Sequence, residues 1–496
     1  SLLALFAIVL PSCLFLYVIN YYWWVSKYPK GPRPYPILGN LRKLNSKDIH
    51  LQFRELSLKY GPVFTVFLPV PVIIITNYEG VKEAYVTKGE SFAARPPIPH
   101  NEDFSFGINA GIFNANGESW QENRRLAISI LRDFGMGRSL MEEKIKLAIS
   151  EYFELIDIEC NSDNVDLRWP IQLMIANIIT ETLFGIRYSY GESQPLVDFM
   201  NAFSSLAEMA LSNLLIRFSP YTLRFVNHIP MMQRVSRKVH GPKFNLMKSF
   251  IELNTDRALE TFNVDGEDSC FVHAYARKIG SSPNITKQQL YAVCLEVFAG
   301  GQETATTTLR WATLLLAANQ KVQDKAREEI LRVVGSDRLP SLSDKHQMPY
   351  TSALVHEVQR RANIVQANVT RSTTEDVDIM GHHIPAGTTV VGDIYQIMAH
   401  DPIFEKPEEF RPERYLSEDG KTLRKELVER TLPFSAGKRQ CAGEGLARAE
   451  LFLIIAATLQ HYHLLPTDES PIDLEPKSTV NMMPKQQNLK LVPVHI

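Results

Sequence analysis

The stretch FSAGKRQCAG, residues 434–443, places one cysteine, Cys441, in a basic loop punctuated by glycines. A run with the apolar pattern of a helix, EGLARAELFLIIAATL, follows it, so Cys441 lies just before a predicted helix N-terminus. The free N–H groups and partial positive charge at such an end stabilise an anionic sulfur. Lys438 and Arg439 add positive charge, and Phe434 is placed to shield the sulfur from water. These residues predict a cysteine that stays ionised rather than one that is a small buried apolar side chain.

The loop carries the complete pattern FxxGxRxCxG, formed by Phe434, Gly437, Arg439, Cys441 and Gly443. This pattern resembles the haem-thiolate loop of the cytochrome P-450 monooxygenases. The resemblance implies a mainly α fold with smaller β regions, haem b as cofactor, and Cys441 as the axial ligand of its iron. An axial thiolate pushes electron density that favours O–O cleavage.

Residues 286–319 are predicted to form one long helix that begins with a capping box at Thr286 and Gln289. Gly300 and Gly301 lie in its middle, where each glycine costs about 1 kcal/mol relative to alanine. This cost indicates that some part of the fold needs the space that the missing side chains leave.

The order Gly300, Gly301, Gln302, Glu303, Thr304 resembles the oxygen-binding kink of the same family. The resemblance implies that Thr304 hydrogen-bonds bound dioxygen and that Glu303 relays protons with water. An ionisable or hydroxyl group near the distal oxygen is what heterolytic cleavage requires. Ala305 stands where many family members carry a second threonine or serine, so the relay is expected to depend more on water.

Three charged residues resemble the structural network of the family. Glu357 and Arg360 are i,i+3 neighbours on one predicted helix face, and Arg414 lies in FRPERYL, residues 410–416. We expect these residues to lock the core behind the haem and to take no part in catalysis.

Trp120 and Arg124 match the WxxxR helix that contacts a haem propionate in the family. Arg95, Arg371 and Arg439 align with its other propionate-binding positions. Arginine suits this role because its planar fork binds carboxylates bidentately. Animal microsomal members more often carry histidine at the position of Arg371, so this chain keeps the charge with a different side chain.

The predicted substrate pocket is lined by residues taken from the alignment with the family, and all but one of them are apolar. They are Phe104, Phe106, Ile112, Phe113, Phe298, Gly300, Val365, Val369 and Val480. Such a lining favours a lipophilic substrate, and Gln366 and Asn368 are expected to add polar contacts.

Residues 2–25 carry no charge and are long enough to cross a hydrocarbon core. Tyr21 to Trp24 form an aromatic belt, and Lys27, Lys30 and Arg33 follow, which favours a cytosolic body. We therefore expect a membrane anchor at residues 1–26, a proline-rich extended hinge at 27–40 and a catalytic domain at 41–496. The apolar run is too long for a cleaved signal peptide and has no small-x-small cleavage site.

The 496-residue chain has a net charge of −2, and 45% of its residues are hydrophobic, as in a globular protein. A nucleic-acid-binding chain is normally basic, so no nucleic-acid partner is expected. The five cysteines form no paired pattern, which argues against a disulfide framework. The body is predicted to be helix-dominated, with strands in VFTVFLPVPVIIIT, in the zone 370–395 and in the final NLKLVPVHI.

No GxGxxG or P-loop is evident, so electrons must come from another protein. The resemblance implies the endoplasmic reticulum membrane as location, NADPH-cytochrome P-450 reductase as donor, and cytochrome b5 as a second possible partner. The expected docking face is a set of basic residues: Arg124, Arg125, Arg132, Arg138, Lys421, Arg424, Lys425 and Lys438. The alternatives are a haem-thiolate isomerase or dehydratase, against which Glu303–Thr304 argues, and a non-enzymatic haem sensor.

Overall fold

The computed structural model describes residues 2–96, 106–107, 109–134, 139–159, 164–212, 230–467, 471–478 and 482–494. Its helices are α1 Leu2–Val25, α2 Ile49–Tyr60, α3 Tyr78–Lys82, α5 Gly117–Asp133, α6 Ser139–Glu159, α7 Arg168–Phe184, α8 Gln194–Ser212, α11 Pro230–Glu260, α12 Phe271–Ala276, α13 Lys287–Ala318, α14 Gln320–Val334, α15 Pro349–Ala362, α16 Ile394–His400, α17 Lys425–Arg430 and α18 Glu444–His461. Its strands are β1 Val63–Leu68, β2 Val70–Ile75, β3 Arg371–Ser372, β4 Val377–Ile379, β5 His382–Ile384, β6 Thr389–Gly392, β7 Tyr462–Pro466, β8 Pro476–Ser478, β9 Met483–Pro484 and β10 Leu489–Pro493.

The main sheet joins strands from the two ends of the body in the order β1-β2-β6-β3. β1 and β2 pair antiparallel from Val63↔Ile75 to Leu68↔Val70, as the run of β-branched residues around a proline predicts. β6 adds to β2 in parallel and β3 adds to β6 antiparallel. β10 pairs with β7, so the strand predicted at the C-terminus is also confirmed.

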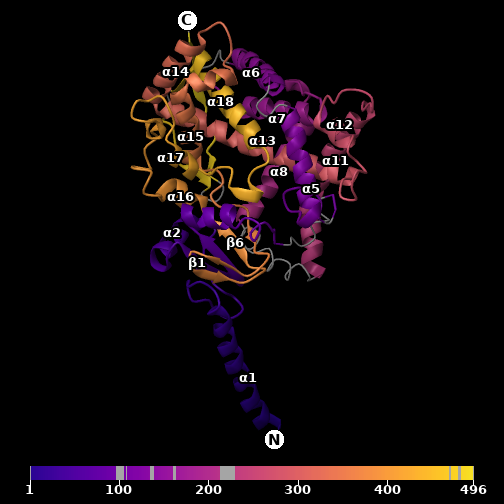
Figure 1. The fold of residues 1–496 in the computed structure, drawn as a ribbon, viewed down its shortest axis with the longest axis vertical. Helices are drawn as coiled ribbons and strands as arrows, with labels where there is room; N and C mark the ends of the chain where they lie inside the picture. Colours follow the sequence, from indigo (N-terminus) through magenta and orange to yellow (C-terminus); the bar gives the residue numbers. More distant parts are fainter. Residues whose placement is uncertain are drawn as a thin grey trace.

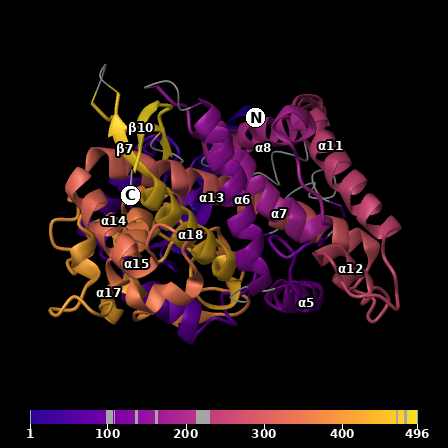
Figure 2. The ribbon, with the colours of Figure 1, turned by 90° about the horizontal axis from the view of Figure 1, so that it is seen from above.

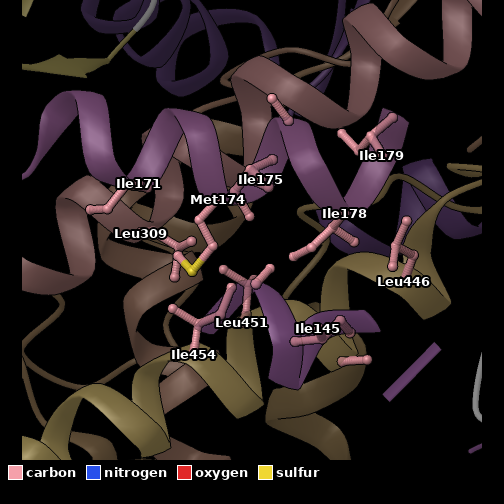
Figure 3. Packing of buried hydrophobic residues seen from close by; sticks show 14 of the residues in the cluster. Ile145, Ile171, Met174, Ile175, Ile178, Ile179, Leu309, Leu446, Leu451 and Ile454 are labelled. Carbon is pink, nitrogen blue, oxygen red and sulfur yellow. The ribbon is translucent and has the colours of Figure 1, made fainter. Parts of the chain in front are cut away.

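The helical body is built around α13, which lies near its middle (Figures 1 and 2). Apolar side chains of α6, α7, α13 and α18 pack together in the largest core cluster, where Met174 and Ile178 of α7 point toward α18 and its Leu451 and Ile454 (Figure 3). The long helix predicted at 286–319 is therefore confirmed. Thr286 caps it by accepting the N–H of Gln289 at 3.2 Å. The reciprocal half of the capping box is absent, because the side chain of Gln289 accepts the N–H of Gly111 instead.

Close packing of α7 against α13 explains one of the two mid-helix glycines. A Cβ at Gly301 would lie 2.9 Å from Cδ1 of Ile179, so a larger residue there would push the two helices apart. Gly300 has a different surrounding, since a Cβ on it would meet no atom within 4 Å. The space beside Gly300 belongs to the site described below.

The N-terminal helix α1 extends away from the end of the body that carries β1 and β6 (Figure 1). In the part of the chain that the structure describes, no helix is both long and apolar enough to cross a membrane. Residues 27–40, expected to form a proline-rich extended hinge, contain one tight turn. Tyr35 and Gly39 pair with each other across a tight turn that folds against β1.

Candidate active site

The backbone conformation of the cysteine loop requires a glycine at position 437. Gly437 has a φ of +72°, and a Cβ on it would lie 1.6 Å from the backbone oxygen of Tyr85, so glycine is required there. The N–H of Cys441 donates to the oxygen of Phe434 at 2.9 Å and closes the loop. Gly443 is the N-cap of α18, and its N–H reaches the sulfur of Cys441. The predicted position just before a helix N-terminus is confirmed.

The thiol of Cys441 is accessible to solvent and yet surrounded by protein. Burial raises the pKa of this thiol, while the N–H of Gly443 and the charge of Arg124 act in the opposite direction. A buried thiol with a raised pKa needs a further positive charge, such as a metal ion, to become a stable thiolate.

Lys438 and Arg439, the two cations predicted beside the sulfur, bind other partners. Lys438 forms an ion pair with Glu90 at 2.6 Å. Arg439 donates to the backbone oxygens of Ala93 and Ala115, each at 2.7 Å. The basic residue that lowers the thiol pKa is instead Arg124 of α5, which donates to the oxygen of Gln440.

Gly300 and Thr304 of α13 are accessible, although α13 is a largely buried helix. They lie one turn apart, and Oγ1 of Thr304 donates to the oxygen of Gly300 at 2.7 Å. Gly300 therefore has open space where a Cβ would stand, and Thr304 exposes its hydroxyl in the middle of a core helix.

Glu303 points toward α8 and away from the Thr304 hydroxyl. Its carboxylate accepts a hydrogen bond from Ser204 of α8 at 3.2 Å. Burial raises its pKa, against the influence of Ser204, Arg310 and Arg168. Adjacent residues on a helix point in different directions, so no direct contact joins Glu303 to the hydroxyl of Thr304.

Four arginines from segments far apart in the sequence gather at the cysteine loop. They are Arg95, Arg124, Arg371 and Arg439, and the last of them belongs to the loop itself. Burial and mutual repulsion lower the pKa of Arg95 to about 9 and that of Arg439 to about 8. Burial lowers the pKa of Arg371 to about 10, and the nearby charge of Arg124 contributes to this shift. Such a concentration of buried positive charge is stable only with an anion in its midst.

Several donors in this cluster have no protein partner. Nε and Nη1 of Arg371 and Nε1 of Trp120 are buried and make no hydrogen bond among the described residues. Arg371 itself is fixed in place, because it lies 3.6 Å from the centre of the Tyr85 ring and donates to the oxygen of Ala436 at 2.7 Å. Free donors within this cluster of cations fit the two propionates of haem, and an accessible cysteine fits its iron.

Glu296 is a residue of this region that the sequence does not single out. Its carboxylate accepts the backbone N–H groups of Ile112 and Phe113, and that of Asn114 also contributes. Burial raises its pKa to about 7, against the influence of these amides and of Arg439. Its position on α13, one turn before Gly300, is the sole signal in the sequence that could have pointed to it.

The predicted substrate residues differ in their exposure to solvent. Phe113 and Val369 are exposed large apolar side chains, and Val365 is half-buried. Phe298 is fully buried, and the centre of its ring lies 4.8 Å from that of Phe199, so its side chain presents no surface to a ligand in this conformation. The buried residues of the set also include Phe106, Ile112, Gln366 and Asn368. Two predicted residues lie outside the described residues: Phe104 and Val480.

The charged network is formed as predicted. Both carboxylate oxygens of Glu357 accept from Arg360, at 2.8 and 2.9 Å, and Nε of Arg414 donates to the same carboxylate at 3.2 Å. All three are almost completely buried. The remaining guanidinium donors bond to backbone oxygens of the segment 398–409, so the network joins α15 to the end of α16 and the loop that follows it.

The expected basic docking face is partly neutralised by the protein itself. Arg424 pairs with Glu426, and Lys425 with Glu429. Arg125 and Arg132 of α5 are exposed and form no ion pair with the described residues. Arg138 lies outside the described residues.

Comparison with known proteins gives one family. The model of the family described as Cytochrome P450 matches residues 29–491. The chain is 35% identical over 509 residues to cytochrome P450 2H2 of Gallus gallus, covering 98% of this chain and 99% of that protein. It is 33% identical over 478 residues to cytochrome P450 2C5 of Oryctolagus cuniculus, covering 95% of each chain. It is 34% identical over 459 residues to cytochrome P450 2E1 of the same species, covering 90% of this chain and 89% of that protein.

Proposed function

The chain belongs to the cytochrome P450 family and is a haem-thiolate monooxygenase, and we propose that it oxidises a lipophilic organic molecule at the endoplasmic reticulum membrane with electrons from NADPH-cytochrome P-450 reductase. Its substrate class is a xenobiotic, a fatty acid or a steroid-like molecule. The observation that carries this proposal is the combination of accessible Cys441, Gly300 and Thr304 within otherwise buried surroundings.

Haem b, bound through Cys441, supplies the iron chemistry that activates dioxygen. Arg95, Arg371 and Arg439 would hold its propionates, and Trp120 and Arg124 would complete that side of the site. Gly443 is assigned the role of orienting the sulfur through its N–H, since this donor already reaches it. Phe434 closes the loop backbone and lies under the guanidinium of Arg448, 4.9 Å away.

Thr304 is proposed to hold a proton at Oγ1 where oxygen is reduced. Its hydroxyl is accessible and donates its one proton to the oxygen of Gly300, so Oγ1 presents its lone pairs from a fixed position and can donate elsewhere once that bond is released. Glu303 supplies protons to this region through water, because a carboxyl whose pKa is raised by burial keeps its proton more readily. The route must pass through water, because Glu303 contacts Ser204.

The substrate is proposed to lie against Gly300, Phe113, Val365 and Val369, with the region of Phe104 and Val480 completing the pocket. The absence of a Cβ at Gly300 leaves room beside the reacting position. The exposed apolar rings and methyl groups exclude water and favour a lipophilic molecule.

The electron donor is proposed to dock on the face that carries Arg125 and Arg132, close to Arg124 and the cysteine loop. The exposed charges suit an acidic partner, which is the property expected of the reductase and of cytochrome b5. Membrane attachment is assigned to residues 1–26, which contain the helix α1 (Leu2–Val25) and carry no charge.

The first experiment is the visible spectrum of the dithionite-reduced protein with carbon monoxide. A strongly red-shifted Soret band that is lost in Cys441→Ser would establish the thiolate ligand. A band typical of histidine or thiol ligation would show that the thiolate is not retained. Product formation that depends on NADPH, reductase and O₂ then tests the monooxygenase, and turnover of a peroxide without reductase would favour an isomerase.

A further inference from the structure

The most deeply buried of the four arginines has an aromatic ring as its neighbour and no acidic side chain. Arg371 exposes only 1% of its surface, and none of its hydrogen bonds among the described residues is with a carboxylate. Its guanidinium carbon lies 3.6 Å from the centre of the Tyr85 ring. The negative face of an aromatic ring attracts a cation, and it does so more strongly where water is excluded. The ring of Tyr85 therefore takes part of the place of a counter-charge.

The protein contacts of Arg371 occupy one face and one nitrogen of its guanidinium. Nη2 donates to Oγ of Ser435 at 3.0 Å and to the oxygen of Ala436 at 2.7 Å. Nε and Nη1 are buried and make no hydrogen bond within the part of the chain that the structure describes. The ring and the cysteine loop thus fix the plane of the guanidinium, and they leave two of its nitrogens to a ligand.

Tyr85 is itself held at both ends. It is fully buried in the π-helical turn Glu83–Thr87, a kind of turn that is found mostly at functional sites. The N–H of Gly392 in β6 donates to its hydroxyl oxygen at 2.8 Å. Its backbone oxygen lies against the cysteine loop, 1.6 Å from where a Cβ of Gly437 would stand. The ring therefore has a fixed position between β6 and the loop that carries the predicted iron ligand.

The other arginines of the cluster do not depend on a ring in the same way. Arg95 and Arg439 each donate to backbone oxygens from two nitrogens, whereas Arg371 donates from Nη2 alone. The charge of Arg371 acts on both of these neighbours, so without an anion their repulsion favours its movement toward water. Arg371 is thus the cation that most needs a second restraint, and the ring of Tyr85 provides it.

We propose that Tyr85 is a positioning residue of the haem site, whose ring holds the guanidinium of Arg371 in the orientation that binds a propionate. This inference rests on the proposed assignment of Arg371 to a propionate, and it adds a residue that acts through that arginine. A donor that is already oriented loses less conformational freedom when its ligand binds. Loss of the attraction between ring and cation should therefore let haem leave the protein faster.

The test changes the charge distribution of the ring while nearly keeping its shape. The variant Tyr85→Phe is compared with a protein that carries pentafluorophenylalanine at the same position, introduced by stop-codon suppression. Fluorination reverses the charge of the ring face, so this ring repels a cation that phenylalanine attracts. The measured quantity is the rate at which each holoprotein releases haem to excess apomyoglobin.

Two controls separate positioning from support of the fold. The same pair of rings is placed in the background Arg371→Gln, which has no cation to position. Pentafluorophenylalanine is also placed at Phe92, a buried residue of the same core cluster whose ring centre lies 6.4 Å from that of Tyr85. The unfolding midpoint of every holoprotein shows whether fluorination has disturbed the core.

We expect the fluorinated ring at position 85 to release haem about tenfold faster than Tyr85→Phe, and Tyr85→Phe to stay close to wild type. In the background Arg371→Gln the two rings should give equal rates, and fluorination at Phe92 should leave the wild-type rate unchanged. Equal rates for the two rings with Arg371 present would overturn the role of Tyr85. The same acceleration in Arg371→Gln, or at Phe92, would overturn it too, because the effect would then not pass through the guanidinium.

The experiment also distinguishes failure of this inference from failure of the assignments on which it rests. Release of haem at the wild-type rate from Arg371→Gln would overturn the propionate role of Arg371 and, with it, the role of Tyr85. The carbon monoxide spectrum of the wild type tests haem binding through Cys441 separately, and a thiolate spectrum would leave the proposed function standing in either case.

Discussion

The guanidinium of Arg439 lies 3.6 Å from the centre of the Trp120 ring. This contact joins the cysteine loop to α5, two segments that are more than 300 residues apart in the chain. Arg439 also donates to the oxygens of Ala93 and Ala115, each at 2.7 Å. One planar cation therefore holds three segments together around the site, a role that the motif in the sequence does not reveal.

The substitution Arg439→Lys tests this role. A lysine cannot stack a planar cation and donate to two carbonyl oxygens at once. An unmet charged hydrogen bond costs about 2 kcal/mol, so we expect the affinity of the variant for haem to fall more than tenfold. Haem per polypeptide, measured by absorbance, is the readout. Lys438→Gln at the exposed neighbouring position should keep full haem, and an Arg439→Lys protein with full haem would contradict the assignment.

The substitution Thr304→Ala should keep haem and the carbon monoxide spectrum but divert electrons into peroxide. A positioned proton donor contributes about 10²–10⁴-fold to a step that it assists, so product per NADPH should fall at least about tenfold. The measurement compares NADPH consumed, peroxide released and product formed. Thr308→Ala is the control, because the Thr308 hydroxyl makes the same kind of helix bond, to Thr304, at 2.8 Å and is buried. Equal coupling in both variants would show that oxygen activation does not depend on Thr304.

The substitution Glu357→Ala leaves Arg360 and Arg414 buried without their carboxylate. Removal of one partner from a buried charged network costs about 3–5 kcal/mol, so the free energy of unfolding should fall by that order. Denaturant unfolding followed by circular dichroism measures it. Glu426→Ala breaks the exposed pair with Arg424 and should leave the unfolding midpoint unchanged. A wild-type midpoint in Glu357→Ala would mean that the network adds no stability.

The raised pKa of Glu296 predicts that the free energy of unfolding depends on pH. Its pKa is raised to about 7 in the folded protein, against about 4.3 in an unfolded chain. The folded state then binds the proton of Glu296 more tightly than the unfolded state does. The contribution of this group to the free energy of unfolding is therefore fully present below pH 4.3, and it is lost as the pH rises to about 7. The full effect is about 4 kcal/mol.

The measurement is the unfolding midpoint between pH 4.5 and 8 for wild type and Glu296→Gln. The amide still offers an oxygen to the N–H groups of Ile112 and Phe113 but does not titrate. We expect the wild-type midpoint to fall relative to that of the variant as the pH rises through this window. Parallel curves would show that Glu296 does not titrate there.

The local patterns of the sequence predicted much of the fold and the centre of the site. The cysteine loop with its following helix, the helix from 287 to 318, the β1–β2 pair and the Glu357 network all depend on residues close together in the chain or on a long motif. Spacing of apolar residues and of glycines is a local property, so it can be seen without knowing the fold.

The partners of individual side chains were decided by the tertiary structure alone. The sequence assigned positive charge near Cys441 to Lys438 and Arg439, but packing directs these side chains to Glu90 and Trp120 and brings Arg124 of α5 to the loop. Phe298 fits a pocket by alignment, yet two rings from other helices bury it. Gly301 and Gly300 look alike in the sequence, and only the approach of Ile179 separates a packing glycine from one that leaves space at the site. The sequence determines which chemistry the chain can carry, because residue types and spacings are local; which atoms meet is settled by contacts between segments hundreds of residues apart.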